Sequence, residues 1–237
     1  GLGITGLGDA LAMLNVTYGS DKSVETTEEI YKWLALNSYE SSIQLAKERG
    51  SFPIFDLQKE IGHPFVESVV NELLPGRVDD YRRYGRRNIA NTTTAPAGSV
   101  SCLTQTTSGI EPAFMLHYTR RKKITENDFD SSVDFIDDSG DRWTEFNVYH
   151  HGFKQWMDAS KDPNISQIST ENLVQMSPYA GATANEIDWV NKVKMQSAAQ
   201  KWICHAISNT TNLPEDIDVE TVKEVYMTGW ELGCKGV

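Results

Sequence analysis

A run of small and turn-forming residues constrains this chain more than any other feature. It covers 95–101 and reads Ala-Pro-Ala-Gly-Ser-Val-Ser, directly after a β-branched segment at 91–94 that is typical of a short strand. Small side chains let several backbone N–H groups converge on one point, Gly98 permits a positive φ, and the hydroxyls of Ser99 and Ser101 add donors. If a helix begins here, its dipole also favours an anion.

These properties together describe a cradle for a phosphate group, and an ordinary tight turn is the alternative interpretation. The candidate phosphate-binding residues are Pro96, Ala97, Gly98, Ser99 and Val100. A second turn is expected at Ser108-Gly109, so the chain reverses soon after the loop.

Apolar periodicity predicts helices on both sides of this segment. The expected helices cover about 6–15, 26–50 (from a capping box at Thr26 and Glu29 to a stop at Gly50), 64–74, 186–205 and 218–233. Helical spacing of aromatic residues predicts a further core-facing stripe within 143–157, formed by Phe146, Tyr149, Phe153 and Trp156. Glycines at 1, 3, 6 and 8 would let the first helix approach another backbone closely, and they make a GxGxxG pattern that lacks the preceding strand of a dinucleotide site. The alternation indicates an α/β protein.

The charge pattern argues against nucleic acid as a partner. The 22 basic and 33 acidic residues give a net charge of −11, which opposes non-specific binding to phosphate backbones. The basic run 120–123 is followed by seven acidic residues between Glu126 and Asp141. We interpret 120–142 as a solvated hairpin or insert. A basic contact for nucleic acid is the alternative, although the neighbouring acids would cancel much of its field.

Cysteine usage and hydropathy point to a cytoplasmic protein. Cys102, Cys204 and Cys234 cannot form a disulfide framework, which indicates a reducing compartment. No signal peptide and no run of 18 apolar residues is present, so no membrane partner is expected. The histidines and cysteines lack the spacing of a metal site, and Cys204 is expected inside the helix 186–205 with a structural role.

Three stretches resemble the C-terminal half of the catalytic subunit of ribonucleotide reductase. They are 1–11, 87–114 (with Thr-Ala-Pro-Ala-Gly-Ser-Val-Ser and Ser-Gly-Ile-Glu-Pro-Ala-Phe) and 200–237 (with Gln-Lys-Trp-Ile, Ala-Ile-Ser-Asn-Thr and Trp-Glu-Leu-Gly-Cys-Lys-Gly-Val). They occur in the family's order and span nearly the whole chain. The sequences of these stretches are most similar to those of the adenosylcobalamin-dependent class II enzymes, and the metal-dependent class I large subunit is the nearest alternative.

The resemblance implies the C-terminal half of a ten-stranded α/β barrel, built from two halves of five parallel strands and incomplete in this chain, so that 1–237 is a single partial domain. In the family, the loop that matches 96–100 binds the substrate phosphates. Family members commonly carry Thr where this chain has Ala97, which removes one hydroxyl donor, and Asp where it has Cys204.

The implied activity is reduction of ribonucleotides to 2′-deoxyribonucleotides by thiyl-radical chemistry. The family's Asn-x-Cys-x-Glu motif matches none of the three cysteines, so no catalytic residue is assigned, and the radical cysteine is expected upstream of Gly1. The implied cofactor is adenosylcobalamin, with no contacts assigned. The implied partners are a ribonucleotide substrate (diphosphate or triphosphate), the N-terminal half of the catalytic chain and a thioredoxin-type reductant, and homodimer formation stays open. A nucleotide- or anion-binding module without reductase activity is the remaining alternative.

Overall fold

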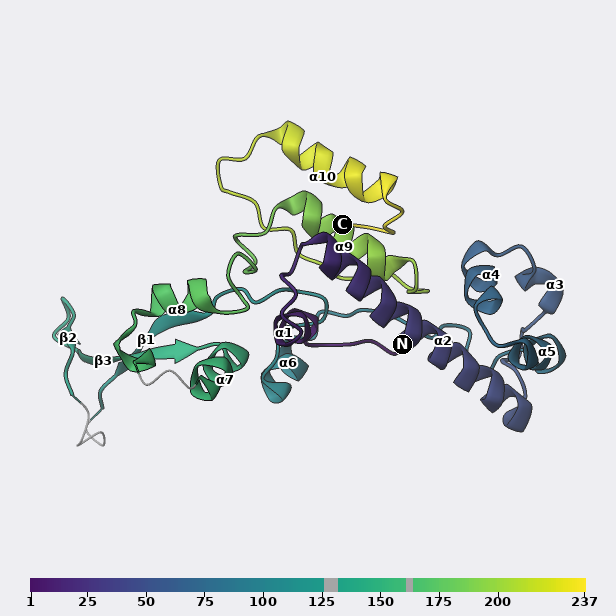
Figure 1. The fold of residues 1–237 in the computed structure, drawn as a ribbon, viewed down its shortest axis with the longest axis horizontal. Coiled ribbons are helices and arrows are strands. Elements are labelled where there is room, and N and C mark those ends of the chain that lie inside the picture. The colour runs from purple at the N-terminus through teal and green to yellow at the C-terminus, as the bar shows by residue number, and fades with distance from the viewer. Residues whose placement is uncertain (126–131, 161–163) are drawn as a thin grey trace.

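The computed structural model describes residues 1–125, 132–160 and 164–237. Helices surround a central group of extended segments, and a small sheet projects to one side (Figure 1). The first elements are α1 Leu7–Met13, α2 Asp21–Arg49, α3 Leu57–Glu60, α4 Pro64–Asn71, α5 Pro75–Tyr84 and α6 Gly98–Thr104. The sheet and later helices are β1 His117–Lys123, β2 Phe135–Ile136, β3 Arg142–Tyr149, α7 His151–Ala159, the 3₁₀ turn Ile165–Gln167, α8 Thr170–Met176, α9 Trp189–Gln200 and α10 Val219–Glu231.

Three extended segments lie side by side and run in parallel at the centre of the molecule. Leu2 pairs with Thr92, and Thr94 pairs with Ile207, each through an isolated parallel bridge. The strand expected at 91–94 is therefore present only as single bridges. Parallel direction places the carboxyl ends of all three segments on the same side, and the small-residue run 95–101 follows one of these ends.

Close backbone approach explains the glycines of the first segment. A Cβ on Gly3 would collide with the carbonyl oxygen of Thr93, and a Cβ on Gly8 would lie 2.9 Å from the carbonyl oxygen of Glu111. Gly6 takes a φ of +82° at the start of α1, a conformation that side chains disfavour. The expected close packing of this segment is confirmed.

Helix α2 begins earlier than the sequence predicted. Its N-cap is Ser20, whose hydroxyl accepts the N–H of Ser23 at 3.2 Å, and not the capping box expected at Thr26. The helix ends at Gly50 with a φ of +82°, as expected. Its inner face carries Tyr31, Tyr39 and Ile43, all fully buried, which pack in one core with α1, α4 and α9.

The helical stripe expected within 143–157 is wrong, because residues 142–149 form strand β3. β3 pairs antiparallel with β1 over 143–149 and with β2 over 142–143. Phe146 and Tyr149, three residues apart, therefore lie on opposite faces of the strand and form no single stripe. Only after Tyr149 does the chain become helical, and Phe153 of α7 is fully buried.

The basic run 120–123 lies on β1, exposed to solvent in this projecting sheet (Figure 1). Three of the acidic residues, Glu126, Asp128 and Asp130, lie outside the described residues. One of the other four, Asp141, pairs with Lys123 of the basic strand, and Glu145, which follows this acidic run, pairs with Arg121 at 2.7 Å. The acids therefore offset the basic charge locally, as the sequence indicated.

Helix α9 ends at Gln200, five residues before the predicted end. The Gln200 side-chain amide donates to the carbonyls of Ile203 and His205, both at 3.0 Å, and holds the chain in a turn that leaves the helix. Cys204 therefore lies outside the helix in which it was expected. Helix α10 begins after Asp218, whose carboxylate accepts the N–H of Thr221, as predicted. Within the described ranges, no helix is long and apolar enough to cross a membrane.

Candidate functional site

The small-residue run forms the start of helix α6 at the carboxyl end of the central segments. Ala97 is the N-cap, and α6 begins at Gly98. The backbone N–H groups of Gly98, Ser99 and Val100 have no hydrogen-bond partner in the part of the chain that the structure describes, and all three residues are exposed. The sequence left open whether a helix begins in this loop; a helix does begin here, and its first three amides have no partner within the described residues.

Two details of the prediction are corrected. Gly98 does not take a positive φ, and a Cβ at this position would meet nothing within 4 Å. Ser101 is buried and its hydroxyl donates to the carbonyl of Gly98 at 2.8 Å, so it is not a free donor. Pro96 has no N–H, and the N–H of Ala97 donates to the hydroxyl of Ser108 at 3.1 Å. The available donors are therefore the amides of 98–100 and the exposed Ser99 hydroxyl.

Residues 105–112, which follow α6, form what we name the return segment. Asp9, which is 3% exposed, joins this segment to helix α1. One carboxylate oxygen accepts the N–H of Thr107 at 2.7 Å. The other lies 2.6 Å from Nε2 of His150 and accepts the hydroxyl of Tyr179 at 2.8 Å. Burial alone would raise the pKa of Asp9, but the hydrogen bond and charge of His150, with the bonds from Thr107 and Tyr179, hold it below the usual 3.8.

A second buried group joins the return segment to α9. The Lys192 ammonium is fully buried and donates to the carbonyl of Thr210 at 2.6 Å and to Asn212 Oδ1 at 2.9 Å. Its charged neighbour is Glu111, with Nζ and Oε2 3.9 Å apart. Burial lowers the pKa of Lys192 and raises that of Glu111, and the opposite charge of each partner only partly offsets this.

A cavity of about 510 Å³ opens beside this network. It lies at the carboxyl ends of the parallel segments, where α/β proteins place their ligands. Its lining includes residues 106–108 and 111–115, together with Tyr118, His150, Ala184, Thr210 and Asn212. Ser108 therefore belongs both to this cavity and to the contact that fixes Ala97. Loop and cavity form one candidate binding site.

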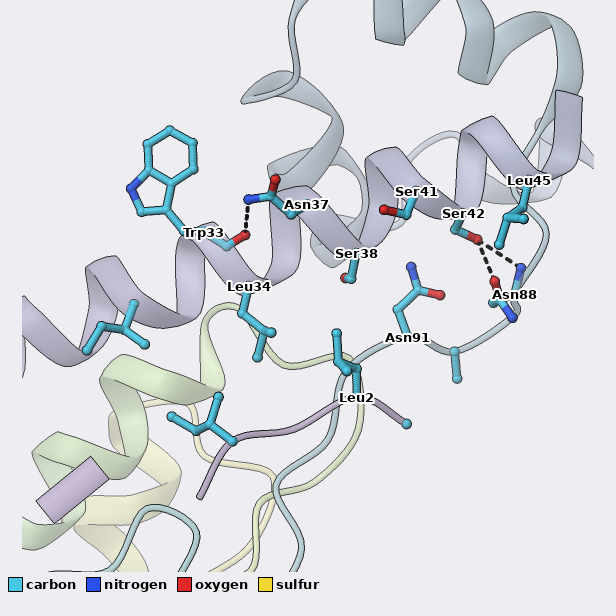
Figure 2. A pocket seen from close by; sticks show the side chains of 14 residues that line it. Leu2, Trp33, Leu34, Asn37, Ser38, Ser41, Ser42, Leu45, Asn88 and Asn91 are labelled. Atoms are coloured by element: carbon cyan, nitrogen blue, oxygen red, sulfur yellow. Dashed lines mark hydrogen bonds between the residues drawn. The ribbon is translucent and has the colours of Figure 1, made fainter. Parts of the chain in front are cut away.

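Figure 2 shows a different cavity, of about 710 Å³, between α2 and the segments 1–4 and 88–91. The Asn91 side chain points toward α2 there, and neither of its polar atoms has a hydrogen-bond partner among the described residues. This cavity lies at the amino ends of the parallel segments, whereas the loop 95–101 follows their carboxyl ends. We do not include it in the candidate site.

Cys204 also lies away from the loop, in the turn after α9. Its sulfur accepts the N–H groups of Thr92 at 3.1 Å and Asn91 at 3.2 Å, and it lines a cavity of about 460 Å³. Burial alone would raise the pKa of this thiol, but the hydrogen bonds from Thr92 and Asn91 and the charge of Lys235 hold it below the usual 9.0. This environment differs from the buried helical position that the sequence suggested.

The sequence patterns did not identify Asp9 and Lys192 as residues of the candidate site. A signal for Lys192 exists, because Lys192, Gln196 and Gln200 are spaced four residues apart and all three are buried on α9. Polar residues at this spacing on a buried face require partners, which here are main-chain carbonyls of the following loops. No local pattern distinguishes Asp9.

Free amides at a helix start, at the carboxyl ends of parallel segments, are an arrangement that often binds anions in proteins of mixed helix and sheet. Comparison with known protein families identifies the family of this chain. The model of the ribonucleotide reductase barrel domain matches residues 1–237, and the chain belongs to this family.

Curated relatives match along the whole chain at low identity. The vitamin B12-dependent ribonucleoside-diphosphate reductase of Mycobacterium tuberculosis (strain CDC 1551 / Oshkosh) is 28% identical over 245 residues, covering 100% of this chain and 30% of the relative. A protein with the same name from Thermoplasma acidophilum is 25% identical, covering 100% and 27%. The ribonucleoside-diphosphate reductase subunit alpha of Chlamydia pneumoniae is 26% identical, covering 99% and 23%. The chain thus spans less than a third of the length of these relatives.

Proposed function

We propose that this chain is one part, a single partial domain, of the catalytic barrel of a ribonucleoside-diphosphate reductase, and that loop 96–100 binds the phosphates of its substrate. The observation that carries the proposal is the set of three amides at 98–100 with no partner among the described residues, in a chain that matches the reductase barrel over all 237 residues. The full enzyme would convert ribonucleotides to 2′-deoxyribonucleotides by thiyl-radical chemistry, in the cytoplasm and with a thioredoxin-type reductant.

The chain's own residues have defined tasks in this proposal. The amides of Gly98, Ser99 and Val100 donate to phosphate oxygens, and the positive end of α6 supports the bound negative charge. The Ser99 hydroxyl adds a donor. Asp9 and Ser108 hold the return segment and Ala97 in place. Fixing the phosphates would fix the position of the ribose relative to catalytic groups that this chain does not supply.

The names of the relatives suggest a cobalamin cofactor, which would supply the radical initiator. The largest cavity described above, about 710 Å³, is too small to enclose a corrin ring with its side chains. None of the three cavities described above encloses such a group by itself, and we assign none of the described residues to cobalamin. The match to the Chlamydia pneumoniae subunit keeps a metal-dependent class I enzyme as the second candidate. Activity of the full-length enzyme that depends on added adenosylcobalamin would favour class II, and activity that requires a separate metal-bearing subunit would favour class I.

The phosphate-binding role is tested by Gly98→Val in the full-length enzyme. A Cβ at Gly98 meets nothing within 4 Å, so the substitution leaves the fold intact but blocks close approach of a phosphate. We expect the KM for ribonucleoside diphosphate to rise about tenfold or more, as loss of one charged hydrogen bond predicts. Steady-state kinetics measure this.

The matched control is Gly76→Val. Gly76 also lies in the first turn of a helix, α5, and has no neighbour within 4 Å of an added Cβ. This control should leave KM unchanged. An unchanged KM in Gly98→Val would refute the phosphate-binding role of the loop.

A further inference from the structure

The buried Lys192 lies outside the loop but is connected to it through a short series of contacts. Its ammonium is removed from solvent, and Glu111, at 3.9 Å, is the one carboxylate paired with it among the described residues. A buried charge with so loose a partner is costly unless its hydrogen bonds are satisfied. Those bonds go to the carbonyl of Thr210 and the side chain of Asn212. Lys192 therefore holds the 210–212 segment against α9.

Glu111 contacts the same residue, Thr210, through its other main-chain group. Its Oε1 accepts the N–H of Thr210 at 2.7 Å, while Lys192 donates to the carbonyl of Thr210 at 2.6 Å. The oppositely charged pair thus contacts both polar groups of one residue. We name Lys192, Glu111 and Thr210 the Thr210 clamp. It joins α9, the segment after Ile207 and the return segment after α6.

The Thr210 clamp continues to the phosphate loop through two further hydrogen bonds. The N–H of Glu111 donates to the carbonyl of Ser108 at 2.8 Å, which closes a tight turn over 108–111. The Ser108 hydroxyl in turn accepts the N–H of Ala97, the N-cap of α6. The position of α6's first turn thus depends on the turn 108–111, and that turn depends on Glu111 being held.

We propose that Lys192 and Glu111 are positioning residues. Through the turn 108–111 they hold the amides of 98–100 in the orientation that binds phosphate. The inference rests on the proposed function of the loop and extends it to residues that touch no substrate. Neutralising one partner leaves the other charge buried without compensation, so the pair acts as a unit.

The test uses Lys192→Met and the neutral pair Lys192→Met/Glu111→Gln in the full-length enzyme. We expect both variants to raise the KM for ribonucleoside diphosphate about tenfold, with kcat changed less than about threefold and the KM for the dithiol reductant unchanged. Glu111→Gln alone keeps an acceptor for the Thr210 N–H but leaves the Lys192 charge buried without its partner, so its KM should rise too, though less than that of Lys192→Met. Lys192→Arg, which keeps a buried cation, should recover part of the lost affinity.

The matched control is Lys194→Met, the same substitution at an exposed position of α9 that should change neither constant. If Lys192→Met fails to fold, the neutral pair, which leaves no uncompensated charge, provides the measurement. An unchanged substrate KM in the folded variants overturns the positioning role, as does an equal change for substrate and reductant. If Gly98→Val raises KM but the Lys192 variants do not, the loop function stands and only this inference fails.

Discussion

At the scale of single residues, Asp9 connects more of the molecule than its place in a short helix suggests. Its carboxylate contacts Thr107, His150 and Tyr179, which lie about 100 to 170 residues away in the sequence. Its pKa is depressed because these contacts outweigh the cost of burial. A carboxylate in this position stabilises the fold only while it is ionised.

The corresponding prediction concerns acid stability. A group with a depressed folded pKa contributes stability above its unfolded pKa, near 3.8, and loses it as pH falls through the lower folded value. Asp9→Asn places an amide donor against the N–H of Thr107, so we expect about 2–3 kcal/mol less stability at pH 7. The difference from the wild type should shrink below pH 4.

Chemical denaturation of the full-length protein at several pH values measures this effect. Asp216→Asn, at an exposed position, is the control and should change stability little at any pH. A pH-independent difference between Asp9→Asn and the wild type would show that the charge of Asp9 is not the stabilising feature.

At the scale of elements, the long helix α2 shows how a local signal can predict a helix start more than one turn too late. Thr26 and Glu29 have the spacing of a capping box, yet Ser20 caps the helix. Thr26 lies inside the helix and its hydroxyl donates to the carbonyl of Lys22. Helix α2 therefore extends far enough to bury Ser23 and Thr27 against Met195 of α9.

Ser20→Ala should consequently destabilise the protein by about 1 kcal/mol, since the N–H of Ser23 loses its acceptor. Thr26→Ala removes only a bond within the helix and should cost less than about 0.5 kcal/mol. Denaturant unfolding of the two variants compares them directly. Equal costs, or a larger cost at Thr26, would contradict the observed helix start.

The helices and strands also show which elements could be predicted from the sequence. Helices at 7–13, 64–71 and 219–231 have local signals, such as apolar periodicity and the Asp218 cap, and they were predicted. The loop 96–100 was predicted because its signal is also local. Strand β3 was missed because its pairing with β1 is not encoded in its own aromatic spacing. Asp9 and Lys192 were missed because their partners come from other segments of the chain.

At the scale of the whole molecule, helices α1, α2 and α9 lie beside the central segments and α10 lies along α9, with α3–α5 on one side and the sheet on the other (Figure 1). Large apolar side chains remain exposed near loop 96–100 and the adjoining cavity, including Leu103 at 84% and Phe114 at 59%. The curated relatives are more than three times as long as this chain. We expect the rest of the reductase to cover these side chains, so each test above uses the full-length protein.

The central claim is that backbone amides at the start of α6 bind the substrate phosphates. Amide hydrogen exchange of the full-length enzyme, with and without ribonucleoside diphosphate, tests it most directly. We expect the amides of Gly98, Ser99 and Val100 to become protected when the nucleotide is added. Protection elsewhere in the protein, with unchanged exchange at these three amides under saturating nucleotide, would contradict it.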